Sequence, residues 1–152
     1  YPLETVAAMK RTILYTQGNA SVVSSVRPEV EVINAQRDAI SAAAVALADQ
    51  LNVAAIIAET KSGATAANIA SDRPTQPIIS VTSEARASQQ LALSYANRSY
   101  IRPDGERAGL DIAKELHAEG LFGEGPATVI IVSGRQPGVI GETDTIRVRV
   151  IQ

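Results

Sequence analysis

The fold is decided by the stretch Thr60-Lys61-Ser62-Gly63-Ala64-Thr65-Ala66, which joins two apolar segments of different kinds. The run Val53–Ala58 before it is continuously apolar, which is typical of a strand buried on both faces of a sheet. The segment Ala66–Ala70 after it consists mostly of small residues, which favour a closely packed helix. The order predicted from these patterns is strand, tight turn and helix.

The turn between this strand and this helix has the composition of an anion-binding site. The first N–H groups of a helix have no partner within the helix and carry partial positive charge. Hydroxyl groups and Lys61 surround them here, so a phosphate fits the place, although no residue of the turn is suited to chemistry on it. The alternative is a plain helix cap, in which Ser62 or Thr65 satisfies the backbone donors. A Walker P-loop is excluded, because Lys61 precedes the only glycine of the turn.

Strands and helices alternate along the rest of the chain. The predicted strands are Val53–Ala58, Pro77–Thr82, Arg98–Arg102, Thr128–Ser133 and Thr145–Ile151. The predicted helices are Asp38–Leu51, the segment after the turn, Glu84–Leu93 with Ser83 as its cap, and Glu106–Glu119 with Asp104 as its cap. This alternation predicts an α/β fold, a three-layer sandwich around a mostly parallel five-stranded sheet.

The last strand differs from the others in its pattern. Ile146, Val148 and Val150 alternate strictly with Arg147 and Arg149. Alternation implies one wet face, so an antiparallel strand at an edge of the sheet is predicted. The two arginines are expected on the wet face, with a position across a subunit interface as the alternative.

The N-terminal residues are predicted to form a helix of their own. Pro2 suits the first position of a helix, and Val6, Met9 and Ile13 recur at helical spacing. An irregular connector with a short extended piece is expected over residues 18–34. The chain is therefore divided into a helix at residues 1–17 and a domain at residues 18–152.

Composition excludes several classes of function. The net charge of -2 argues against a nucleic-acid or anionic-membrane surface, and no apolar run approaches the length of a bilayer-spanning helix. The absence of cysteine excludes disulfides, thiolate zinc sites and cysteine nucleophiles. His117 is the only histidine, and no partners are spaced for a metal site or a catalytic triad around it. A cytoplasmic protein without metal or catalytic residues in this chain is the expectation.

A second loop is expected to face the turn. Ligands of α/β sheets collect at the carboxyl ends of the strands, and Gly134–Asp144 follows the fourth strand as the turn follows the first. If these two strands are neighbours, both loops line one pocket. Arg135 then either donates hydrogen bonds from its guanidinium to phosphate oxygens or is a solvated loop residue. Gly138 and Gly141 either permit positive φ angles or let the backbone approach a ligand.

Taken in order, the motifs resemble the C-terminal domain of pyruvate kinase over nearly the whole chain. The residues that carry this resemblance are Thr60–Ala66, Arg73-Pro74, Pro77–Thr82, Ser133–Gly138 and Thr143–Val148, with Tyr1–Val6 similar to the helix that leaves the family's catalytic barrel. Each motif is weak alone, whereas their succession is specific.

The resemblance implies a regulatory and assembly module rather than a catalyst. Pyruvate kinase transfers a phosphoryl group from phosphoenolpyruvate to ADP with divalent magnesium and monovalent potassium ions, in a β/α barrel that this chain lacks. The chain alone is therefore expected to be inactive. The family's C-terminal domain implies a phosphorylated effector held by the Thr60–Thr65 turn and the Gly134–Asp144 loop, and a contribution to a homotetramer.

Two departures from the family pattern bear on the effector. Ala64 stands where many members carry arginine, and the stretch Ile101–Leu110 is short and lacks tryptophan. A monophosphate, or no ligand, therefore fits as well as a sugar bisphosphate. The alternatives are a self-contained α/β enzyme or binding protein for a small phosphorylated metabolite, and an assembly module whose ligand site has decayed.

Overall fold

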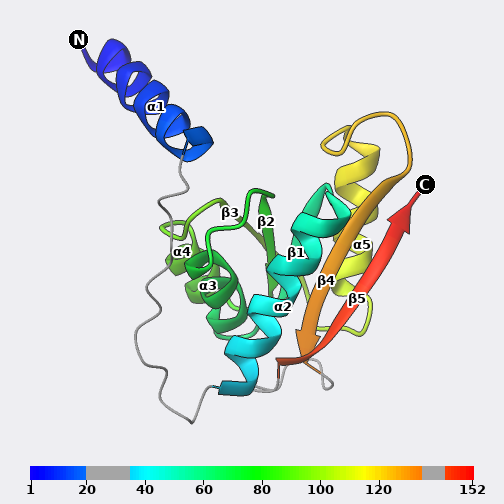
Figure 1. Cartoon of the computed structure of the whole chain (residues 1–152). Coiled ribbons are helices and arrows are strands. Elements are labelled where there is room, and N and C mark those ends of the chain that lie inside the picture. The colour runs from blue at the N-terminus through cyan, green and yellow to red at the C-terminus, as the bar shows by residue number, and fades with distance from the viewer. Residues whose placement is uncertain (20–34, 135–142) are drawn as a thin grey trace. The chain divides into compact units, whose positions relative to one another are not determined.

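A single five-stranded sheet organises the part of the chain after residue 34. The computed structural model describes residues 1–19, 35–134 and 143–152. The sheet has the strand order β3-β2-β1-β4-β5 (Figure 1). Its strands are β1 (Ala55–Glu59), β2 (Ile78–Thr82), β3 (Asn97–Ile101), β4 (Ala127–Gly134) and β5 (Thr143–Ile151).

The pairing directions agree with the prediction. The pairs β1–β2, β2–β3 and β1–β4 are parallel, whereas β5 runs antiparallel to β4 at the edge of the sheet. The predicted mostly parallel sheet with an antiparallel last strand is thus confirmed. Since β1 and β4 are neighbours, the segments that follow them leave from the same edge of the sheet.

Helices cover both faces of the sheet and complete three layers (Figure 1). One face packs against α2 (Ala35–Leu51), α3 (Ala64–Ser71) and α4 (Ala85–Leu91), and the other against α5 (Ala108–Ala118). Ala44 and Ala48 of α2 are fully buried, and their short side chains let the helix backbone lie close to the strands. The central strand β1 is buried from Ala55 to Ala58, as the continuous apolar run predicted.

Two predicted helix caps are wrong. The helix α4 begins after Glu84, and the Glu84 N–H donates to the Thr82 hydroxyl rather than to Ser83. The helix α5 begins after Arg107, three residues beyond the predicted cap Asp104. Both Ser83 and Asp104 instead contact Lys61, a long-range interaction that local capping patterns do not reveal.

The N-terminal helix α1 (Pro2–Asn19) belongs to a separate unit, residues 1–30, and is described by itself. Its side chains through Thr16 are exposed. The extended piece predicted before Asn34 and the loop residues Arg135, Gly138 and Gly141 lie outside the described residues. No helix of the described ranges is both long enough and apolar enough to span a membrane.

Candidate functional site

The turn between β1 and α3 is built around Gly63. This residue is the N-cap of α3 with φ 88°, a left-handed conformation that favours glycine. A Cβ at this position would lie 3.3 Å from Leu91 Cγ, so space as well as conformation disfavours a side chain. The Gly63 N–H donates to the Thr60 hydroxyl at 3.0 Å, which closes the turn.

Among the residues that the structure describes, no side chain caps the start of α3. The cap residue is a glycine and makes no side-chain cap hydrogen bond. The alternative interpretation of a plain cap by Ser62 or Thr65 is therefore wrong. Ser62 is exposed, and the buried Thr65 hydroxyl shares a 2.7 Å hydrogen bond with the Thr143 hydroxyl. Without a side-chain cap, the helix terminus keeps the partial positive charge that suits an anion.

The contact between Thr65 and Thr143 joins the turn to the last strand. Thr143 is the first residue of β5 and directly follows the segment 135–142. Both threonines are buried. The sequence predicted that the turn and this loop share one pocket, and the structure brings the turn beside the residue where the loop ends. A shared pocket stays a prediction, because Arg135, Gly138 and Gly141 are outside the described part of the chain.

Lys61 is held by acidic residues from two other loops. Its ammonium lies 2.6 Å from Asp104 Oδ2 and 3.2 Å from Glu84 Oε1, and it donates to the Ser83 hydroxyl at 3.0 Å. The hydrogen bond with Asp104, followed by that with Glu84, raises the pKa of Lys61, and the same contact lowers the pKa of Asp104. The cation predicted for a phosphate is thus already neutralised within the chain.

A second charged cluster lies at the end of β1, and the sequence did not reveal it. Glu59, the last residue of β1, accepts a hydrogen bond from the Gly109 N–H at 2.8 Å and lies 3.3 Å from Arg147 Nη2. Arg147 also donates to the Ser133 hydroxyl at 3.1 Å. The expectation that Arg147 lies on a wet face is wrong, because its guanidinium is partly buried against Glu59 and β4.

Burial dominates the ionisation of Glu59. Only 16% of its side chain is exposed, and this desolvation raises the pKa of Glu59 above its ordinary value of 4.5. The Gly109 hydrogen bond and the Arg147 charge both act to lower the pKa, yet they do not outweigh burial. The hydrogen bond from the Gly109 N–H shows that Glu59, at the end of β1, caps the start of α5.

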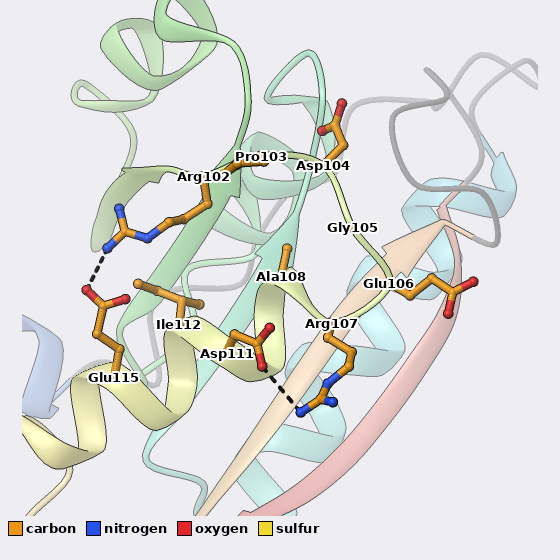
Figure 2. Close-up of a pocket in the computed structure, with 10 residues that line it drawn as sticks. All are labelled: Arg102, Pro103, Asp104, Gly105, Glu106, Arg107, Ala108, Asp111, Ile112 and Glu115. Carbon is orange, nitrogen blue, oxygen red and sulfur yellow. Dashed lines mark hydrogen bonds and ion pairs between the residues drawn. The ribbon is translucent and has the colours of Figure 1, made fainter.

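A cavity of about 530 Å³ lies between the loop after β3 and the first turns of α5. Figure 2 shows two ion pairs there, Arg102 with Glu115 and Arg107 with Asp111, whereas the Asp104 side chain points away from both arginines. The residues of the 60–65 turn are not among those that line this cavity. Within the described ranges, no three acidic, histidine or cysteine residues are grouped to hold a metal ion.

Fold and site together define a three-layer α/β domain in which no described side chain caps the helix start at the carboxyl edge of the sheet. The pyruvate kinase alpha/beta domain family matches residues 38–149. The chain therefore belongs to this family.

Curated relatives agree with this assignment over the whole chain. The chain is 31% identical to pyruvate kinase 2 of Synechocystis sp., over 100% of this chain and 26% of that protein. It is 35% identical to the pyruvate kinase of Sporosarcina psychrophila, over 99% of this chain and 26% of that protein. It is 30% identical to the pyruvate kinase of Mycobacterium tuberculosis, over 97% of this chain and 31% of that protein. The chain thus spans between about a quarter and a third of the length of these relatives.

Proposed function

We propose that this chain is the regulatory and assembly domain of a pyruvate kinase and that it binds a phosphorylated effector at the Thr60–Thr65 turn. Family membership supports the first part, since the relatives that share this domain bear that name. In the whole protein, phosphoenolpyruvate and ADP would yield pyruvate and ATP, with magnesium and potassium acting in the catalytic barrel. The domain contributes binding and assembly, and no catalytic group.

The observation that carries the effector proposal is the uncapped start of α3. The cap residue makes no side-chain hydrogen bond, and the terminus opens at the carboxyl edge of the sheet, where ligands of α/β folds bind. Thr60 and Ser62 supply further hydroxyl groups at the turn. Backbone N–H groups with a helix dipole behind them bind phosphate without a catalytic apparatus.

A phosphate monoester is the ligand class that this turn fits best. Ala64 offers no second cation beside Lys61, so a second phosphate group would find no partner in the described part of the turn. Bare inorganic phosphate is expected to bind with a Kd of about 1 mM, which corresponds to about 4 kcal/mol. A sugar monophosphate adds contacts and should bind more tightly.

Amide chemical shifts of the labelled 152-residue chain test this proposal. Titration with inorganic phosphate and with a sugar monophosphate is expected to move the amide signals of residues 61–66 in a saturable manner. Sodium chloride at matched ionic strength is the control, because it reproduces screening without a tetrahedral anion. Unchanged signals at residues 61–66 under saturating sugar phosphate would contradict the effector proposal.

The edge strand β5 is proposed as the assembly surface. Its outer backbone edge has no partner among the described strands, and Val148 and Val150 are 39% and 60% exposed. An unpaired edge with exposed valines favours pairing with another strand, and a two-fold axis would bring the same strand of a second copy against it. Sedimentation of the chain at increasing concentration measures whether such a homo-oligomer forms.

A further inference from the structure

The environment of Lys61 has a consequence for any anion at the turn. Two carboxylates and one ammonium carry a local charge of about -1, which repels an incoming anion. Glu84 after β2 and Asp104 after β3 attract the ammonium, and its third N–H donates to the Ser83 hydroxyl. Lys61 therefore cannot neutralise a phosphate while these contacts persist.

These contacts are of the kind that a ligand can displace. The Lys61 side chain is 26% exposed, and those of Asp104 and Glu84 are 34% and 52% exposed. Ion pairs with this exposure contribute little stability, because water screens them. The flexible four-carbon stem of lysine lets the ammonium change partners without movement of the backbone. A dianion at the turn can therefore compete with the two carboxylates for the Lys61 ammonium.

We propose that Asp104 and Glu84 form an autoinhibitory clamp on Lys61, which a phosphate dianion at the Thr60–Thr65 turn must open. This inference rests on the proposed effector function. The clamp lowers the affinity for phosphate and discriminates against singly charged anions, which compete poorly with two carboxylates for one ammonium. Opening the clamp frees Asp104, so ligand binding at the turn is transmitted to the loop that leads into α5.

The loop released in this way is linked to the rest of the domain. Arg102 at its start pairs with Glu115 of α5 at 2.6 Å, and the loop ends at Arg107, the cap residue of that helix. Glu59 holds the Gly109 N–H at the same helix start. Ligand binding should therefore be reported by backbone signals of residues 103–106 as well as by those of the turn.

The test compares two substitutions that remove the same charge. Asp104→Asn removes one arm of the clamp, whereas Asp111→Asn removes a carboxylate of α5 that pairs with Arg107 and not with Lys61. Each labelled variant is titrated with phosphate at about pH 8, where the dianion dominates. We expect Asp104→Asn to lower the Kd about twofold to fivefold and Asp111→Asn to leave it nearly unchanged.

A third variant separates a clamp from a general charge effect. Lys61→Met keeps an apolar stem of similar length, and residues 103–106 should no longer respond to phosphate in it. If the wild-type chain binds phosphate at the turn and Asp104→Asn binds no more tightly than Asp111→Asn, the clamp is overturned and the effector proposal stands. If neither the wild-type chain nor Asp104→Asn binds phosphate at the turn, the effector proposal fails and the clamp fails with it.

Discussion

Glu59 Oε1 lies 2.8 Å from the Gly109 nitrogen, so the last residue of β1 caps a helix that begins 49 positions later in the chain. The carboxylate stands directly before Thr60, the first residue of the turn. One side chain thus anchors the strand end, the start of α5 and, through Arg147, the edge strand β5. This contact therefore links three elements of the domain.

Removal of this carboxylate is expected to destabilise the domain. Glu59→Ala leaves the Gly109 N–H without its acceptor and the partly buried Arg147 without its carboxylate partner, which should cost about 2–3 kcal/mol of unfolding free energy. Glu59→Gln keeps an acceptor oxygen and should cost about 1 kcal/mol or less. Denaturant unfolding measures both variants. Equal losses for alanine and glutamine would contradict the capping role.

The titration of Glu59 should make the free energy of unfolding depend on pH. Burial raises its pKa above 4.5, so the folded chain holds this proton more tightly than the unfolded chain does. The part of the stability that is linked to this proton is therefore full at pH values below about 4.5 and is lost as the pH rises through the pKa of the folded state. Unfolding free energies of the wild-type chain and Glu59→Gln, measured across the acidic range, should converge or cross as the pH rises. A difference that is independent of pH would refute the assigned sign.

A methyl group at position 109 should disturb the same contact. A Cβ there would lie 2.5 Å from Glu59 Oε1 and 3.0 Å from Ile131 Cγ2, so the carboxylate or the strand must shift. Gly109→Ala is expected to cost about 1–3 kcal/mol, although alanine is the better helix former. Gly105→Ala is the matched control, because nothing lies within 4 Å of its Cβ position. Comparable losses in thermal unfolding for both variants would argue against the close approach.

A substitution at an exposed position of the edge strand β5 can test assembly without disturbing the fold. Val150→Lys places a charge at a 60% exposed position of β5, and charged edge residues oppose strand pairing. The variant should shift the chain toward monomer in sedimentation, with the free energy of unfolding changed by less than about 0.5 kcal/mol. Leu93→Lys makes the same change at a 94% exposed position outside β5 and should leave the association unchanged. A wild-type chain that is monomeric near millimolar concentration removes the basis for the assembly proposal.

The chain alone should have no phosphotransferase activity. Phosphoryl transfer relies on metal ions and positioned cations, and the described residues contain no group suited to a metal. A coupled assay with phosphoenolpyruvate, ADP and magnesium is expected to read background. Turnover that persists through repeated purification would show that the chain carries an active site of its own.

Local patterns in the sequence predicted the elements of this fold but not its long-range contacts. The continuous run of β1 indicated a buried strand, because burial on both faces leaves a direct signal. The alternation of β5 indicated an edge strand, although Val148 and Val150 are exposed and Arg147 is partly buried. Asp104 has the form of a helix cap, yet it pairs with Lys61, 43 positions away. Arg147 alternates with apolar residues, yet it faces a carboxylate buried at the end of β1. Such pairings depend on which strands become neighbours, and a pattern within one segment does not encode that.

A crystal structure of the wild-type chain with tungstate, an electron-dense tetrahedral dianion that stands in for phosphate, tests the effector site most directly. We expect the ion at the start of α3, within hydrogen-bonding distance of the backbone N–H groups that follow Gly63, with the Lys61 ammonium turned from Asp104 toward it. An empty turn, with tungstate bound only elsewhere on the surface, would contradict the proposal that this domain receives a phosphorylated effector there.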